Sequence, residues 1–428
     1  MELAYGTRLY DCPTEPSSRR DRSPAPACGP SPGALTGRSW HPATHRARSS
    51  PARPVGSARS ANSDTWRRPR RRHVSSALTS RRCAACPRAS CSTRWPSSAA
   101  SGNLFEIVSA AYWRENYGFR QPGSVVAWAG EYLDDPVGHE HIERLARIRA
   151  EATGSDASLE EAALDLLGGS HDVVVARRHV VADARTDDQL VSSGVLTPDE
   201  HAAYIAFTVQ SLVEIQQAQP HAKYIAVFQN WLRPAGASFE HLHKQLVAVD
   251  EHGPQVDREL ALLSADHGLY QHAIADLAVR EGLVVAATDG AVAFAGVGHR
   301  YPAFEVYSTS AANLPHEHAP EEIRAVSDVL HALHAATGVH VPTNEEWHYR
   351  PPGAPWPMPW RIVLKWRVSN PAGFEGGTKV YVNTIDPWEL RRRTVVELQR
   401  LRDEGQLSPN IRIGDECTPD DARLRYAG

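Results

Sequence analysis

The alternation of apolar and polar positions predicts regular structure from Asn103 onward. Residues 169–181, GSHDVVVARRHVV, are a predicted strand with His171 and His179 near its ends. Two further strands are predicted at 223–231 and 241–249, because apolar residues alternate with polar ones or form short apolar runs. A turn of small residues lies between those two strands, and we expect them to pair as antiparallel neighbours.

A long helix is predicted between the first two of these strands, at residues 196–219. Thr197 is a suitable capping residue, Pro198 suits the first helical position, and Glu200 completes a capping box. A second helical stretch is predicted from about Val256 to Glu281.

A similar series follows in the second half of the chain. It comprises a strand at 303–310, a helix at 319–338 with Pro320 near its start, and a strand at 358–368. No glycine-rich phosphate loop joins a strand to a helix, which argues against a parallel doubly wound sheet. We therefore predict an α+β fold with two histidine-triad-like halves, residues 103–255 and 256–428, each an antiparallel sheet with packed helices.

Residues 1–102 differ in composition from the rest of the chain. Arg, Ser, Pro and Ala dominate them, and Phe, Ile and Lys are absent. Such a segment cannot bury enough apolar surface to offset its chain entropy, so we expect it to be disordered. A natural disordered tail, an organelle transit peptide and a translated wrong reading frame all explain it, and the last is slightly favoured.

The bulk properties exclude several classes of partner. The chain has 428 residues, a formal charge of −4 and a pI of about 6.6, which favours neither nucleic acid nor an anionic membrane surface. No apolar run approaches the roughly 18 residues of a membrane helix, and no secretory signal is present. We expect a soluble cytoplasmic protein. The spacing of Cys83 and Cys86 suggests metal or redox use.

The stretch VFQNWLRPAGASFEHLHKQLVAV, residues 227–249, concentrates the candidate chemistry. Its polar and small residues include Asn230, Gly236, Ala237, Ser238, His241, His243 and Gln245. In a strand, alternate side chains share a face, so the two histidines and the glutamine project together. From the residues alone, the pair is either half of a metal site or a nucleophilic imidazole with a second imidazole that orients it.

The spacing N-x5-G-A-S-x2-H-x-H-x-Q resembles the active-site stretch of the galactose-1-phosphate uridylyltransferase family, within the histidine triad superfamily. The segment AGFEGGTKVYVN, residues 372–383, resembles a C-terminal segment of one branch of that family, and NLFEIVS resembles an N-terminal one. The resemblance covers roughly residues 103–400.

This resemblance implies a division of roles within the motif. His243 matches the nucleophile that takes a nucleoside monophosphate from a nucleotide-sugar and passes it to a sugar 1-phosphate. Gln245 and Ser238 match phosphate contacts. The expected substrate-binding residues are Asn230, Gly236, Ala237, Glu375 and Thr378.

The resemblance also implies a structural zinc ion. His241 matches a ligand, and the other expected ligands are His179, Cys83 and Cys86. Two thiolates and two imidazoles suit a closed tetrahedral zinc site.

Three other clusters in the second half are weaker candidates. Arg361 and Lys365 stand where related enzymes often carry metal-ligand histidines, so a second metal site is not expected there; the cations either meet a phosphate or carboxylate or lie solvated on an edge strand. The stretch Trp347–Trp360 is either a sugar-stacking wall or a structural loop. Residues 314–322, with His316 and His318, are expected to form a surface loop.

The predicted function is a nucleotidyltransferase of carbohydrate metabolism, of the UDP-glucose–hexose-1-phosphate uridylyltransferase type in galactose metabolism. A histidine triad hydrolase or phosphorylase acting on nucleotide-sugars is one alternative. A non-catalytic, zinc-stabilised binding protein is another. The resemblance also implies a homodimer.

Overall fold

The computed structural model describes most of the chain after residue 97. The described ranges are 98–102 (backbone only), 107–154, 157–168, 170–186, 189–369 and 372–427. No helix of this described part is long and apolar enough to cross a membrane. Cys83, Cys86 and nearly all of the segment 1–102 lie outside it, although its last five residues form a strand.

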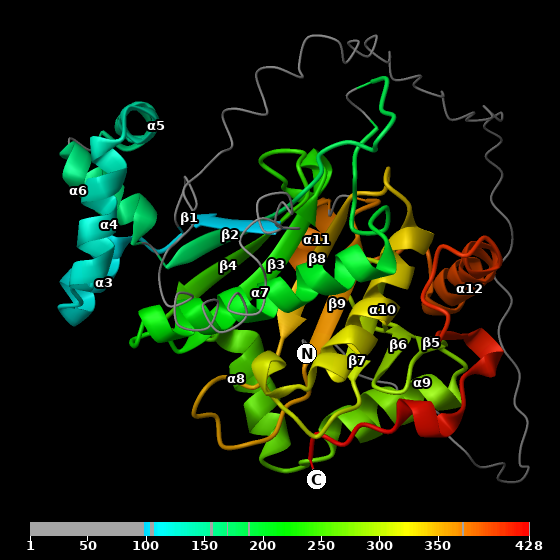
Figure 1. Ribbon diagram of the computed structural model, residues 1–428. Coiled ribbons are helices and arrows are strands. Elements are labelled where there is room, and N and C mark those ends of the chain that lie inside the picture. The colour runs from blue at the N-terminus through cyan, green and yellow to red at the C-terminus, as the bar shows by residue number, and fades with distance from the viewer. Residues whose placement is uncertain are drawn as a thin grey trace, which may run out of the picture.

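One large antiparallel sheet organises the fold (Figure 1). Its ten strands within the described part have the order β1-β2-β4-β3-β8-β9-β7-β6-β5-β10. Their bounds are β1 Ser98–Gly102, β2 His171–Ala176, β3 Tyr224–Trp231, β4 His243–Val249, β5 Val284–Ala287, β6 Ala291–Ala295, β7 Ala303–Ser308, β8 Thr343–His348, β9 Arg361–Trp366 and β10 Arg412–Ile413. The predicted α+β class with an antiparallel sheet is confirmed.

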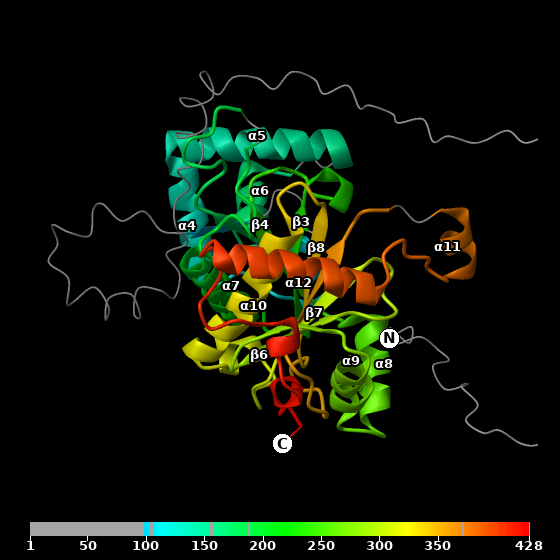
Figure 2. The same ribbon diagram turned by 90° about the vertical axis from the view of Figure 1, so that its right-hand side faces the viewer.

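Helices cover both faces of this sheet and extend beyond its β1 end. Their bounds are α3 Ala110–Tyr117, α4 Gly123–Asp134, α5 Pro136–Thr153, α6 Leu159–Leu167, α7 Pro198–Ala218, α8 Gly253–Leu263, α9 Asp276–Arg280, α10 Pro320–Thr337, α11 Gly373–Thr378 and α12 Pro387–Asp403. Helices α7 and α10 pack side by side over one face, with α12 against α10 (Figures 1 and 2). Helices α4, α5 and α6 form a separate small apolar cluster.

The predicted caps of the long helices are observed. Thr197 accepts a hydrogen bond from the backbone N–H of Glu200, and the Glu200 carboxylate accepts one from the Thr197 N–H. Helix α10 begins at Pro320 and ends before Gly338. The prediction of one helix over 256–281 is wrong, because α8 ends at Leu263 and a loop, a π-helical turn and α9 follow. Helix α8 also begins before residue 256, so the proposed boundary between the halves falls inside a helix.

The same order of elements occurs twice in the chain. One series is β2, α7, β3, β4, and the other is β7, α10, β8, β9. In each series the last strand lies between the other two, and β3 pairs with β8 to join the series. The two series therefore form one continuous sheet, not two separate sheets as predicted. That they are related histidine-triad units stays a prediction.

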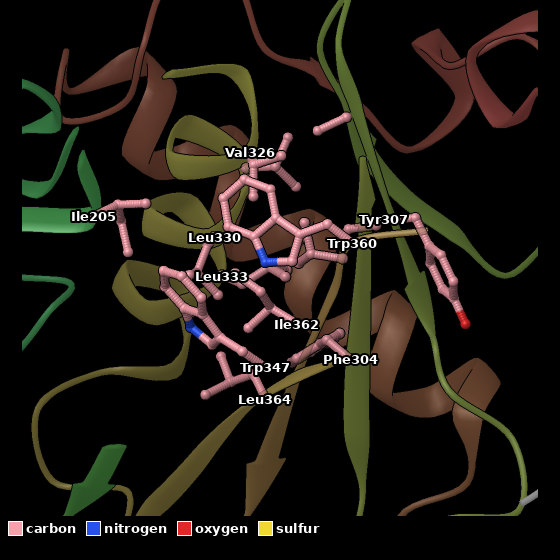
Figure 3. Close-up of a cluster of buried hydrophobic side chains, with 14 of the residues drawn as sticks. Ile205, Phe304, Tyr307, Val326, Leu330, Leu333, Trp347, Trp360, Ile362 and Leu364 are labelled. Atoms are coloured by element: carbon pink, nitrogen blue, oxygen red, sulfur yellow. The ribbon is translucent and has the colours of Figure 1, made fainter. Parts of the chain in front are cut away.

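The main apolar core lies between the sheet and the layer of α7 and α10. Trp347 and Trp360 are 2% and 0% exposed within it, packed with Leu330, Leu333 and Ile362 (Figure 3). Their ring centroids are 5.2 Å apart. The sugar-stacking wall considered for residues 347–360 is therefore wrong for these two rings, because a buried ring cannot stack on a ligand.

Candidate active site

The turn between β3 and β4 places the candidate nucleophile. Leu232 has a φ of 65° and Gly236 a φ of 89°, on either side of a short 3-10 turn over Arg233–Ala235. Gly236 suits this left-handed backbone, whereas Leu232 is a non-glycine residue held there at an energetic cost. Such strain is concentrated at functional sites, which agrees with the location of this turn directly before the histidines.

His243 is the first residue of β4 and is 1% exposed. Its Nδ1 lies 2.7 Å from the backbone carbonyl oxygen of His241, so the N–H is assigned to Nδ1. The Phe239 ring stacks on the imidazole with centroids 3.8 Å apart. Burial lowers the pKa of His243 below its usual value. The imidazole is thus neutral, and its buried Nε2 carries a lone pair with no hydrogen-bond partner among the described residues.

Gln245 lies two residues further along β4, on the same sheet face as His243. Its Oε1 lies 3.0 Å from Nε2 of His171, a buried residue of β2. The other ring nitrogen of His171 accepts a hydrogen bond from the Ile107 N–H, so Nε2 donates to Gln245. This contact fixes the orientation of the Gln245 amide, whose NH₂ end is the end able to donate to a phosphate oxygen.

His241 and His179 lie next to each other, as the zinc prediction requires. Their rings stack with centroids 5.0 Å apart. His241 is predicted to lie within the strand, but it precedes β4. Its Nε2 is 2.7 Å from the carbonyl oxygen of Ala176. Burial lowers the pKa of His241 to about 4, so this imidazole is neutral, as a metal ligand must be. Two adjacent imidazoles fit half of the expected ligand set, and the Cys83/Cys86 half lies outside the described residues.

Asn230 connects the turn to the second half of the chain. Its Oδ1 accepts a hydrogen bond of 2.6 Å from Nδ2 of Asn344, on β8. The same Nδ2 donates to the carbonyl oxygen of Ala235, within the turn. Ala237 is buried, whereas Gly236 and Ser238 are exposed. The turn that carries Ser238, one of the two predicted phosphate contacts, is therefore held in place by β8.

Glu375 and Thr378 lie apart from this cluster. The segment GFEGGT, residues 373–378, forms the exposed helix α11, which projects from the side of the molecule (Figure 2). Both side chains bond locally: Glu375 accepts from the Ala372 N–H, and the Thr378 hydroxyl donates to the Phe374 carbonyl. No hydrogen bond within the described ranges joins α11 to His243, and the substrate role of these two residues stays a prediction.

Arg361 and Lys365 lie on β9, a central strand of the sheet. Both bind carboxylates and are not solvated charges on an edge strand. Arg361 lies 2.6 Å from Glu259 of α8, and both are buried. Lys365 lies 2.6 Å from Glu346 of β8. In the same half, His318 is buried and bonds to Ser308, so the loop expected at the surface contributes one histidine to the interior.

Three contacts at the site were missed by sequence reasoning. The sequence indicates His171 only as a strand histidine, and it indicates no role for Phe239 or Asn344. For His171 the sequence does carry a signal, because its predicted strand belongs to the same half as the motif and could pair with it. Asn344 pairs with Asn230 across 114 residues of sequence, and no local pattern indicates such a pairing.

Comparison with known proteins gives a family but no activity. A family model described as "Domain of unknown function (DUF4921)" matches residues 59–426. The chain belongs to this family. The DUF4921 match includes the positions of Cys83 and Cys86. No curated protein sequence matches the chain.

Several solved structures resemble this DUF4921 protein at low identity. An ADP-glucose phosphorylase from Arabidopsis thaliana with bound ADP-glucose is 19% identical, with a TM-score of 0.43 over 52% of this chain and 71% of that one. A uridylyltransferase mutant is 19% identical, with a TM-score of 0.44 over 54% and 78%. A GalT-like protein from Arabidopsis thaliana is 19% identical, with a TM-score of 0.43 over 52% and 74%. Similarities at this level do not extend the activities of those proteins to this chain.

Proposed function

We propose that this protein is a nucleotidyltransferase that acts through a covalent nucleotidyl-histidine on His243. The supporting observation is the state of the imidazole: Nδ1 donates to the His241 carbonyl, and Nε2 is left with a lone pair and no described partner. A neutral imidazole held in one orientation is suited to attack on phosphorus. The spacing of the motif, which resembles that of the uridylyltransferases, agrees with this role.

The proposed first step transfers a nucleoside monophosphate from a nucleotide-sugar to the enzyme. The Nε2 lone pair forms a bond to the α-phosphorus, and the bond from that phosphorus to the bridging oxygen breaks. The electron pair leaves with the sugar 1-phosphate. The backbone carbonyl of His241 holds the Nδ1 proton and stabilises the positive charge that develops on the ring.

Gln245 and Ser238 are the proposed contacts for the non-bridging phosphate oxygens. Gln245 is held by His171, so its amide is oriented before the substrate arrives. A donor that is fixed in advance costs no reorganisation as charge builds in the transition state. In the second step a sugar 1-phosphate oxygen attacks the same phosphorus, and the electron pair returns to Nε2.

We further propose that zinc binds His241 and His179 together with Cys83 and Cys86. The ion would tie the segment before β1 to the loop that carries His241. The stacking of the two imidazoles and the lowered pKa of His241 support the histidine half of this set. We also propose a homodimer, from the family resemblance, and a cytoplasmic location, from the charge and composition of the chain.

The test is a chase experiment on the intact chain. The protein is incubated with UDP-glucose and ADP-glucose labelled in the nucleotide, and freed of ligand. It is then exposed to a sugar 1-phosphate, to inorganic phosphate or to buffer alone. Acid-labile label that is released by the sugar 1-phosphate supports the transferase, release by inorganic phosphate supports a phosphorylase, and release in buffer supports a hydrolase. A folded protein that takes no label from any donor would refute covalent catalysis with these nucleotides.

A further inference from the structure

Arg367 lies directly after β9, on the sheet face that carries His243. Lys365 pairs with Asn344 in the β8–β9 ladder, and the Arg367 N–H continues the ladder to the carbonyl of Pro342. Side chains two residues apart on a strand share a face. Arg367 and Lys365 are therefore on the same face as Asn344 and, through β3, as Asn230.

The contacts of Arg367 are with neutral groups. Its guanidinium lies over the Tyr301 ring, 4.5 Å from the centroid, and Nη1 donates to Oδ1 of Asn344 at 2.6 Å. Its buried Nε has no hydrogen-bond partner within the described part of the chain. On the same face, Arg361 and Lys365 each hold a carboxylate. An unneutralised, partly buried guanidinium is costly, and it is well suited to bind an anion.

The sheet register relates Arg367 to the nucleophile across the strands between them. Phe228 of β3 pairs with Gln245 of β4. In this antiparallel register, Asn230 is opposite His243. Asn230 pairs with Asn344, and Asn344 with Lys365. Three steps between strands of about 4.8 Å separate β4 from β9, which is about 14 Å between backbones. The side chains of Asn230 and Asn344, which bond to each other, lie in this interval, and Arg367 donates to Asn344 at its far end.

We propose that Arg367, positioned by Asn344 and Tyr301, forms a subsite for the phosphate group next to the phosphorus that His243 attacks. The inference rests on the proposed function. When the P–O bond breaks, the electron pair adds negative charge to the departing phosphate, and Arg367 meets that charge. In the return step the same subsite holds the attacking phosphate while the P–N bond breaks. The ligand is a phosphate, either the monoester of a sugar 1-phosphate or inorganic phosphate.

Binding is measured first, on the full-length chain with His243→Ala, so that no chemistry intervenes. Calorimetric titrations use glucose 1-phosphate and, separately, inorganic phosphate. Arg367→Met keeps the length of the side chain and removes its charge, and we expect affinity to fall about tenfold to a hundredfold, as for the loss of a charge-assisted hydrogen bond. Arg367→Lys keeps the charge without the planar fork and should restore part of the affinity.

Arg300→Met is the matched control. Arg300 also stacks on a tyrosine, 4.6 Å from the Tyr381 centroid, but it is exposed and donates to the Tyr381 hydroxyl. Its loss should leave phosphate affinity unchanged. Preference for glucose 1-phosphate identifies the monoester as the ligand, and preference for inorganic phosphate identifies a phosphorylase subsite.

The outcomes separate this inference from the proposed function. If Arg367→Met binds both phosphates as tightly as the parent, or if the parent binds neither, the subsite is refuted. Labelling uses the protein with His243 intact. If Arg367→Met then takes up label normally and phosphates release that label at an unchanged rate, the subsite is refuted and covalent catalysis stands. Absence of label in every protein would refute covalent catalysis instead, and the inference with it.

Discussion

At the scale of single residues, the two histidines of the motif differ in their surroundings. His243 is held by a backbone carbonyl on one nitrogen and by Phe239 on its face, with Nε2 unpaired within the described residues. His241 donates to Ala176 and stacks on His179. The sequence predicted both imidazoles on one strand, but only His243 lies on it and His241 precedes it. It could not show which nitrogen carries the proton, because that depends on backbone groups brought together by folding.

The zinc proposal gives a prediction for His241. His241→Ala should remove zinc from the purified full-length protein and lower its melting temperature, because a structural metal contributes to folding free energy. Metal content is measured by elemental analysis alongside thermal unfolding. His252→Ala is the control, since His252 pairs with Asp257 away from this cluster. Full zinc content in His241→Ala would contradict the assigned ligand.

At the scale of the element, β4 has buried residues on both faces. Lys244, between His243 and Gln245, is 0% exposed on the opposite face, 2.6 Å from Glu345 of β8 and 3.0 Å from Gln229 of β3. His334 of α10 also contacts Glu345. Burial lowers the pKa of Lys244, and although burial alone would raise that of Glu345, Lys244 and His334 lower it overall. The strand alternation was predictable, whereas the burial of a lysine was not, because its partner comes from a distant strand.

Lys244→Met should therefore destabilise the fold, with little effect on His243, which lies on the opposite face of β4. Removing one partner leaves the Glu345 charge buried, at a cost of about 3–5 kcal/mol. Adding Glu345→Leu should recover much of that loss, because both charges are then gone. Urea unfolding of the single and double variants measures the difference. A double variant that is no more stable than Lys244→Met would contradict this explanation.

At the scale of the whole molecule, the second series of elements supplies parts of the candidate site. Asn344 and Arg367 come from β8 and the end of β9, and they meet the turn before β4 through Asn230. Periodicity and caps predicted five of the ten described strands and the helices α7 and α10. The joining of β3 to β8 into one sheet depends on contacts more than 100 residues apart, and the break after α8 depends on packing, so neither could be predicted locally.

The buried Glu259–Arg361 pair links α8 to this sheet and predicts an acid-dependent stability. Burial alone would raise the pKa of Glu259, but Arg361 overcomes it and lowers the value from 4.5 to about 2. A lowered folded-state pKa stabilises the fold above about pH 4.5, and this stabilisation is lost as the pH falls toward 2. Glu259→Gln should cost about 3–5 kcal/mol at pH 7 and clearly less at pH 3.

Unfolding by urea at the two pH values checks this prediction. Glu389→Gln serves as the control, because Glu389 pairs with Arg392 and Arg393 on the exposed surface of α12, where such pairs contribute little. Equal losses for Glu259→Gln at pH 7 and pH 3 would contradict the role given to the ion pair.

The most direct test of covalent catalysis is the site of nucleotide attachment. The intact protein is incubated with a panel of nucleotide-sugars without acceptor, digested under alkaline conditions that preserve phosphoramidates, and mapped by mass spectrometry. We predict a nucleoside monophosphate on His243, absent from His243→Ala and still formed in Arg300→Met. A modification on His241 or His179 instead, or none on a folded protein across the panel, would contradict the assignment of His243 as the nucleophile.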